Sequence, residues 1–228
     1  MNYLIWDFDG TLAFRDGLWS GALLEVLDQE VSHHGVSREA IQPYLRSGFP
    51  WHTPELSHSH LSSPELWWES LNPIFFQAYC ALGLSKTLAQ QLTTRVRSQY
   101  YNLSRWNVYD DTYQALDQLT SYGWRHIILS NHGPELTTLI EHLNLHTRVM
   151  KVFNSANTGY EKPHPAAFQL VLDAVTTYEK LWMIGDNIIA DIYGAAYKGI
   201  PGILVRKPHP DAVHFCETLL QIVACVEA

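Results

Sequence analysis

The chain contains few cysteines, and their spacing forms no recognisable pattern. Cys80, Cys216 and Cys225 are the only three among 228 residues, an odd number without a C-x-x-C pair. Such usage argues against a disulfide framework of the kind found in small secreted domains. We therefore expect free thiols and a cytoplasmic protein.

Long apolar runs are also missing. No stretch approaches the roughly 20 apolar residues that a membrane-spanning helix needs. The uncharged segment 71–85 is interrupted by Asn72, Pro73 and Gln77. The sequence does not open with a basic segment followed by an apolar stretch and a cleavage site, so we expect neither a leader nor a membrane span.

Basic residues are scarce. Fifteen Lys and Arg stand against 23 Asp and Glu, which gives a formal net charge of -8. A broad nucleic-acid-binding surface needs a basic face, so we expect no nucleic-acid partner. An anionic small molecule remains compatible with this charge, because one local site can be positive on an acidic protein.

The residues that are abundant favour a well-packed globular protein. Hydrophobic residues make up 46% of the chain, charged residues only 17%, and eight Trp and twelve Tyr supply bulky side chains for a core. A chain of this length suits one large domain, or a core with a smaller domain inserted in it.

The order of the expected elements indicates an α/β fold with an insertion. After a first strand at 3–6, helical periodicity dominates residues 16–105, where Pro73 should kink or break a helix and a further helix should span 86–103. Strands then alternate with helices; we expect strands at 124–131, 149–153, 181–186 and 202–205, and helices at 111–122, 134–143, 165–175 and 191–198. Alternation of this kind predicts a Rossmann-like parallel sheet with helices on both faces. We assign residues 1–14 and 106–228 to the core and residues 15–105 to an inserted helical domain.

Two carboxylates end the first strand. In "YLIWDFDGTL", Asp7 and Asp9 lie on the same face of an extended backbone. Two such charges about 4 Å apart repel by roughly 4 kcal/mol at an effective dielectric constant near 20, so a cation is expected to offset the repulsion. The alternative is a simple turn, since Asp-Gly is a common turn dipeptide and Asp can cap a helix.

Other strand ends should lie beside this pair, because ligands of open α/β sheets bind beyond the carboxyl ends of the strands. Asp186 ends a later apolar strand, and with Asp7 and Asp9 it would suit Mg²⁺, which is held by a few carboxylates plus water and phosphate. Ser130 and the neighbouring Asn131 end another strand and could cradle a phosphate, although a capped turn is the alternative.

Two further residues have both a functional and an ordinary interpretation. Lys162 lies in the loop "GYEKPHP", where it could balance the carboxylates and a phosphate dianion, or could be a surface lysine. Asp191 follows Asp186 by five positions and could support the site, or could simply be a carboxylate at a helix N-terminus.

Taken together, these segments resemble the motifs of the haloacid dehalogenase superfamily of phosphohydrolases, over nearly the whole chain. The family pattern D-x-D-G-T is matched by residues 7–11, the strand ending in Ser by "IILSN", the Lys before Pro by Lys162-Pro163, and G-D-x-x-x-x-D by residues 185–191. Each motif alone is weak, but the four occur in the family's order.

The resemblance implies a role for each of these residues. Asp7 would be the nucleophile that forms an aspartyl-phosphate, and Asp9 would protonate the leaving alcohol and then activate water. Mg²⁺ would be bound by Asp186, by the Asp7 carboxylate and by the Asp9 backbone carbonyl, with Asp191 supporting Asp186 or Lys162. The phosphate-binding residues would be Thr11, Ser130, Asn131 and Lys162.

The motif details favour a phosphatase over related activities. Dehalogenases of the superfamily lack an acid at the Asp9 position, and Thr11 is typical of its phosphatases, whereas the sugar-phosphate mutases often have Val there. Ala190 departs from the family, which commonly has Asn or Asp beside the last Asp. A Mg²⁺-dependent phosphatase acting on a small phosphorylated metabolite is the leading interpretation. The alternatives are a sugar-phosphate mutase and a catalytically silent binding protein on the same fold. The sequence specifies neither the substrate nor an oligomeric state.

The insertion occupies the position of the family's helical cap, which would close over the substrate. Arg46, Trp51 and His52 lie in its loop "RSGFPWHTPE", where such caps often carry substrate-specificity residues. The alternative is an ordinary surface loop with the Trp packed inward.

Overall fold

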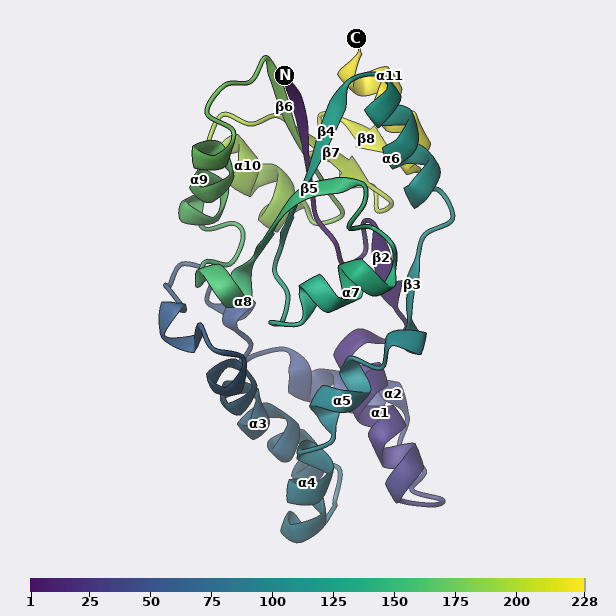
Figure 1. Cartoon of the computed structure of the whole chain (residues 1–228). Helices are drawn as coiled ribbons and strands as arrows, with labels where there is room; N and C mark the ends of the chain where they lie inside the picture. Colours follow the sequence, from purple (N-terminus) through teal and green to yellow (C-terminus); the bar gives the residue numbers. More distant parts are fainter. Residues whose placement is uncertain (228) are drawn as a thin grey trace.

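The structure, a computed structural model, describes residues 1–227 and is built around one parallel sheet (Figure 1). Its six strands follow the order β5-β4-β1-β6-β7-β8, and every neighbouring pair is parallel. The strands span Asn2–Trp6 (β1), Trp124–Ser130 (β4), Val149–Asn154 (β5), Lys180–Gly185 (β6), Gly202–Val205 (β7) and Phe215–Cys216 (β8). The Rossmann-like sheet predicted from the sequence is confirmed.

Helices cover both faces of the sheet because successive side chains of β1 point to opposite faces. Leu4 and Trp6 belong to the cluster with α6 (Thr112–Ser121), α7 (Leu136–His142) and α11 (Ile222–Val226). Tyr3 and Ile5 belong to the opposite cluster, with α9 (Pro165–Ala174) and α10 (Gly194–Ala196). A short helix, α8 (Ser155–Thr158), follows β5. Buried on both faces, β1 reads as a continuous apolar run.

Five helices within residues 15–105 gather beyond the carboxyl ends of the strands (Figure 1). They are α1 (Leu18–Glu30), α2 (Arg38–Ile41), α3 (Pro64–Ala81), α4 (Lys86–Thr93) and α5 (Val96–Tyr100), joined by short 3-10 turns at Gln42–Leu45, Pro50–His52, Ser59–Leu61 and Leu103–Arg105. We call residues 15–105 the helical insertion. Within residues 1–227, no helix combines the length and apolarity needed to cross a membrane.

The structure corrects three expectations about these elements. Of the two outcomes expected at Pro73, a kink or a break, the break does not occur: α3 continues past Pro73, with Leu71 and Phe75 buried on either side. The helix expected over 86–103 is two helices, α4 and α5. The helix expected at 191–198 begins earlier, as a π-helical turn at Ile188–Tyr193 that continues into α10.

A pair of short strands flanks the helical insertion. Two short strands, β2 (Ala13–Arg15) and β3 (Trp106–Val108), pair antiparallel where the chain leaves and re-enters the sheet region. They bring the two ends of the helical insertion side by side. Three residues are too few to show the alternation that marks a strand in a sequence.

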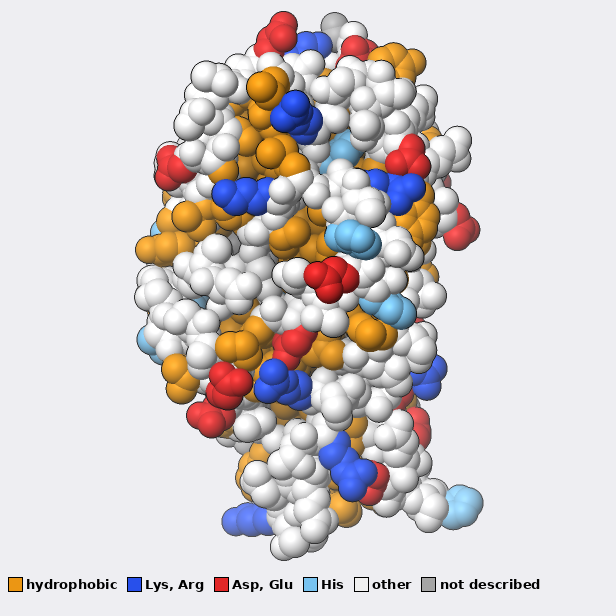
Figure 2. Space-filling model, in the orientation of Figure 1, with side chains coloured by type: hydrophobic (Ala, Val, Ile, Leu, Met, Phe, Trp, Pro, Cys, Tyr) orange, Lys and Arg blue, Asp and Glu red, His pale blue; other side chains and the backbone are white. Residues whose placement is uncertain are grey.

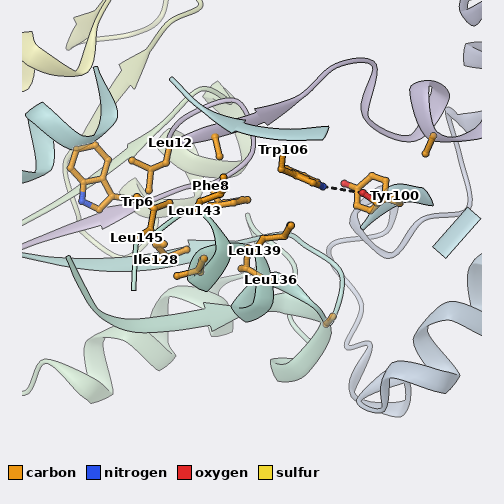
Figure 3. Packing of buried hydrophobic residues seen from close by; sticks show 14 of the residues in the cluster. Trp6, Phe8, Leu12, Tyr100, Trp106, Ile128, Leu136, Leu139, Leu143 and Leu145 are labelled. Carbon is orange, nitrogen blue, oxygen red and sulfur yellow. Dashed lines mark hydrogen bonds between the residues drawn. The ribbon is translucent and has the colours of Figure 1, made fainter. Parts of the chain in front are cut away.

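The helical insertion shares a hydrophobic core with one face of the sheet. One cluster of buried side chains runs from Trp6 and Phe8 through Trp106 and Tyr100 into α1, α3 and α4. Figure 3 shows part of this cluster, with the Trp106 indole donating a hydrogen bond of 2.9 Å to the Tyr100 carbonyl. The aromatic side chains therefore fix the helices against the carboxyl edge of the sheet.

Acidic and basic side chains are interspersed on the face drawn in Figure 2, with no gathering of one sign.

Candidate active site

Three neighbouring strands end in polar residues at one edge of the sheet. Asp7 follows β1 directly, Ser130 is the last residue of β4, and Asp186 follows β6. Because β4, β1 and β6 are adjacent, these residues lie side by side, as the sequence predicts. The turn after Asp9 requires a glycine: Gly10 has φ of +82°, and a Cβ there would lie 2.5 Å from Asp186 Oδ2.

A buried lysine joins two of the carboxylates. Lys162 Nζ lies 2.8 Å from Asp7 Oδ1 and 2.6 Å from Asp191 Oδ1. Burial alone would lower the pKa of Lys162, but the two carboxylates outweigh it and hold that pKa above its ordinary value. Lys162 is therefore a permanent cation in the site rather than a surface lysine.

The Asp7 carboxylate is oriented by two hydroxyl groups. Thr11 Oγ1 donates to Asp7 Oδ2 at 3.2 Å, and Ser130 Oγ lies 3.5 Å from Asp7 Oδ1. Thr11 and Ser130 are both fully buried and neither lines the cavity described below. The structure thus places these two predicted phosphate-binding residues behind Asp7, where they position its carboxylate.

Asn131 is another predicted phosphate-binding residue, and its side chain forms hydrogen bonds with the backbone of Lys162. Its amide nitrogen donates to the Lys162 carbonyl at 2.8 Å, and its amide oxygen accepts from the Lys162 backbone nitrogen at 2.6 Å. This double contact fixes the backbone that carries Lys162 against the end of β4. Asn131 still lines the cavity, but its polar atoms hold the lysine in place.

Asp9 differs sharply from Asp7 in its surroundings. Its side chain keeps 22% of its surface exposed toward the cavity, yet Oδ1 is buried and has no hydrogen-bond partner within residues 1–227. Burial raises the pKa of Asp9 well above its usual value, and the negative charges of Asp7 and Asp186 raise it further against the opposing effect of Lys162. These surroundings disfavour the charged form of Asp9 relative to an exposed carboxyl group.

A histidine that the sequence did not single out lies beside Asp9. His132 Nε2 is 3.7 Å from Asp9 Oδ2 and is itself buried without a hydrogen bond in the described residues. Burial lowers the pKa of His132 to about 4, so the ring is neutral at neutral pH. No sequence signal pointed to it, since it is one polar residue in the loop that follows β4.

The acidic cluster fits a divalent cation. Asp7, Asp186 and Asp191 each offer an oxygen within 4.8 Å of the others. Both Asp191 oxygens already accept hydrogen bonds, one from Lys162 and one from the Asn187 backbone nitrogen at 3.0 Å. Asp186 Oδ2 instead faces an exposed cation, Lys207, at 2.5 Å. A positively charged group thus already contacts one carboxylate of the acidic cluster. Hard oxygen ligands of this kind suit Mg²⁺.

Close approach of backbone and carboxylate supports this arrangement. A Cβ at Gly185 would lie 2.1 Å from Asp191 Oδ2, so the strand end must be glycine for Asp191 to sit there. Asn187, also unforeseen, caps the following turn, because its side-chain oxygen accepts from the backbone nitrogens of Ile189 and Ala190 at 3.0 Å each.

A cavity of about 430 Å³ opens in front of the carboxylates and is closed on its far side by the helical insertion. Of the predicted specificity residues, Trp51 lines this cavity. Arg46 and His52 do not: Arg46 is exposed on the surface, and His52 turns back to accept a bond from the Phe49 backbone nitrogen at 3.3 Å. In this conformation, Arg46 and His52 would therefore not contact a ligand bound in the cavity.

The sequence matches a family model described as haloacid dehalogenase-like hydrolase over residues 1–199. Among curated proteins, it is 21% identical over 162 residues to haloacid dehalogenase-like hydrolase domain-containing protein 3 of Danio rerio. That match covers 71% of this chain and 66% of the Danio rerio protein, just under two thirds of its length.

Solved structures with the same fold bear several different names. The HAD-hydrolase YfnB from Bacillus subtilis, described as bound to magnesium, has a TM-score of 0.73 and 17% identity, with 100% of this chain and 99% of that chain covered. The 2-haloacid dehalogenase from Pseudomonas syringae pv. Tomato DC3000 has a TM-score of 0.67 and 19% identity, with 100% and 98% covered. Other similar structures are named as phosphatases or as a phosphoglucomutase. At these identities the likeness shows the fold, and the match over residues 1–199 shows the family: the chain belongs to the haloacid dehalogenase-like hydrolases.

Proposed function

We propose that this hydrolase is a Mg²⁺-dependent phosphatase that cleaves a small phosphomonoester through an aspartyl-phosphate on Asp7. The observation that carries the proposal is Asp9, a carboxyl group with a raised pKa that faces the cavity beside Asp7. A departing halide needs no proton, whereas a departing alkoxide does. An acid at this position is therefore of use in phosphate ester cleavage and of none in dehalogenation.

The first chemical step joins Asp7 to phosphorus. A carboxylate oxygen of Asp7 attacks, the bond from phosphorus to the ester oxygen breaks, and Asp9 gives its proton to that oxygen so that a neutral alcohol leaves. Thr11 and Ser130 keep the Asp7 carboxylate aimed, and Lys162 balances its charge and that of the phosphoryl oxygens.

The second step returns the enzyme to its starting state. Asp9, now ionised, takes a proton from a water molecule whose oxygen attacks phosphorus, and the bond between phosphorus and Asp7 breaks. Inorganic phosphate leaves, Asp7 is a carboxylate again and Asp9 is again protonated. Both steps use the same two side chains.

The residues that would hold Mg²⁺ are Asp7 and Asp186, with the Asp9 backbone carbonyl as the predicted third protein ligand. When bound there, the ion would offset the negative charge that gathers on the phosphoryl oxygens. Asp191 would act indirectly, by holding Lys162. Residues 15–105 would form the cap, since they supply the far wall of the cavity and can exclude water from the reacting groups.

Turnover of p-nitrophenyl phosphate tests the proposal. We expect Mg²⁺-dependent release of p-nitrophenol that EDTA abolishes and added Mg²⁺ restores. Asp7→Asn keeps the shape of the side chain and removes the attacking charge, so it should abolish turnover while circular dichroism shows an unchanged fold. Activity near the parent level in Asp7→Asn, or in a metal-free preparation, would refute the mechanism.

A further inference from the structure

The wall of the cavity that faces the catalytic carboxylates is uncharged and mostly apolar, with a tyrosine hydroxyl and two indole N–H groups as its polar side-chain atoms. The helical insertion contributes five residues to the lining, and within the described chain none of them is charged. These five, the apolar wall, are Leu18, Trp19, Trp51, Pro54 and Tyr100. All the charged groups of the lining come from the sheet edge opposite.

Cations of the helical insertion are engaged elsewhere or lie outside the cavity. Arg15 is fully buried and bound to Glu25 at 2.5 Å. The other arginines of the insertion with ion pairs are Arg38 with Asp16, Arg95 with Glu30, Arg97 with Glu135 and Arg105 with Glu25. Arg46 and Lys86 are exposed and do not line the cavity. A second anionic group on a substrate would therefore meet the apolar wall without a partner, which is costly.

Aromatic rings give the apolar wall a fixed shape. Trp19 stacks on Tyr100 with ring centres 3.7 Å apart and planes 7° from parallel, and Trp51 stacks on Phe49 at 4.6 Å and 15°. Rings held in this way on their neighbours do not reorient easily. The wall is thus prepared for a flat apolar group.

Two aliphatic side chains at the cavity are left in water. Leu18, from the insertion, is 39% exposed, and Ile189, from the turn after β6, is 60% exposed; both line the cavity. Leu18 has φ of +43°, a left-handed conformation that is unfavourable for leucine. Backbone strain of this kind tends to occur at functional positions. An apolar ligand would cover both side chains.

From this wall we infer that the preferred substrates are phosphomonoesters of an uncharged, apolar alcohol of aromatic size. The inference rests on the proposed phosphatase activity and adds the chemical class of the leaving group. The phosphate would lie at Lys162 and the carboxylates, and the alcohol would lie against Trp51, Leu18 and Ile189. Esters with a second phosphate or a carboxylate, and polyhydroxylated sugar phosphates, would fit poorly.

A matched pair of substrates tests this directly. Benzyl phosphate and 4-carboxybenzyl phosphate share a benzylic leaving oxygen and differ by one carboxylate. We expect kcat/KM with Mg²⁺ to be at least tenfold higher for benzyl phosphate, and also at least tenfold higher than for glycerol 1-phosphate. Equal values, or a preference for either of the other two esters, would overturn the inference while leaving the phosphatase proposal standing. Absence of Mg²⁺-dependent turnover with any ester would overturn both.

Variants of the wall localise the effect. Trp51→Ala should reduce the preference for benzyl over 4-carboxybenzyl phosphate to within threefold, and Trp51→Phe should retain most of it. Arg46→Ala, in the same loop but outside the cavity, should leave the preference unchanged. Leu18→Ala provides a second variant should Trp51→Ala fail to fold. A preference that survives both Trp51→Ala and Leu18→Ala in folded protein would show that the wall does not read the leaving group.

Discussion

Asp7 and Asp9 are two residues apart, yet their carboxyl groups have different partners. Lys162, Thr11 and Ser130 surround the Asp7 carboxylate. Asp9 has a buried oxygen without a partner and a raised pKa. This difference agrees with the roles that we propose, attack by Asp7 and proton transfer by Asp9, a division that recurs in enzymes with paired carboxylates.

The first prediction at this scale concerns the acid. Asp9→Asn removes the transferable proton, so kcat for an alkyl phosphate should fall by roughly 100- to 10,000-fold, the usual contribution of a general acid or base. The phosphorylation step with p-nitrophenyl phosphate should fall less, because nitrophenolate leaves without a proton. Burst kinetics of p-nitrophenol release measure that step separately from hydrolysis. Equal losses in phosphorylation for both esters would argue against Asp9 as the acid.

A second prediction concerns Lys207, whose side chain is 74% exposed yet reaches Asp186 Oδ2. The ammonium and Mg²⁺ would compete for this oxygen. Because exposed ion pairs are worth up to about 1 kcal/mol, Lys207→Ala should tighten Mg²⁺ binding by up to about fivefold. Titration calorimetry measures the Kd for Mg²⁺. Lys198→Ala is the charge-matched control, because Lys198 donates its hydrogen bond to Gln169 and not to a carboxylate of the site. Weaker Mg²⁺ binding in Lys207→Ala alone would show that the lysine helps to hold the site together.

The site residues that could be predicted from the sequence are those that follow a recognisable strand. Asp7 and Asp186 follow apolar strands, and a strand end in a parallel sheet has a known place. His132, Asn187 and Lys207 lie on loops, where a single polar residue carries no periodic signal. Arg46 and His52 show the converse: a suitable loop composition said nothing about the direction in which its side chains point.

At the scale of elements, the strands that can be predicted from the sequence are those with a long enough run of apolar residues. Long buried strands such as β1 and β4 were foreseen, but β8, with two residues, and the β2–β3 pair were not. Pro73 shows how packing overrides a local rule: its ring removes one backbone donor, yet buried neighbours on both sides keep α3 continuous. Helix α3 is therefore held by its tertiary contacts more than by propensity.

His126 joins three elements and gives a pH prediction. From β4, its Nδ1 accepts from the Trp6 indole of β1 at 3.0 Å, so Nε2 carries the proton and faces the Leu116 carbonyl of α6 at 3.1 Å. Burial lowers the pKa of His126 to about 4, against the opposing effects of that carbonyl and of Asp117. A second proton would also place Nδ1–H against the Trp6 N–H. The neutral ring is the form that the fold accepts.

Acid should therefore weaken this junction. In the unfolded chain His126 binds a proton once the pH falls below about 6.5, whereas in the folded chain it does so only near pH 4. The free energy of unfolding therefore decreases as the pH falls from about 6.5 to about 4. The full effect is about 3 kcal/mol, at 1.36 kcal/mol for each unit of pKa. Urea unfolding of the parent and of His126→Asn at each pH isolates the contribution of His126, because the effects of the other titrating groups cancel in the difference between the two proteins. A difference between the two proteins that stays constant from pH 7 to 4 would contradict the assignment.

At the scale of the whole molecule, the sequence separates a helical insertion from the sheet region, but the two share one hydrophobic core. Residues 15–105 form one continuous insertion, but their aromatic side chains join the cluster on one face of the sheet (Figure 3). Gly133, after β4, lets the insertion come this close, because a Cβ there would lie 2.5 Å from the Tyr101 hydroxyl. Contacts between segments far apart in sequence leave no periodic trace, so the shared core could not be predicted.

The position of β1 in the middle of the sheet has a consequence for the order in which the chain can fold during synthesis. Trp6 pairs with Ile128 on one side and Ile184 on the other, so β1 leaves the ribosome roughly 120 residues before its earlier partner. At 5–20 residues per second, this apolar strand waits on the order of 10 s without a neighbour. The helices of residues 18–100 emerge during that interval, and pairs such as α3 with α4 and α1 with α5 can contact each other before β4 is made. The helical insertion can thus begin to take shape before the sheet edge that it faces exists.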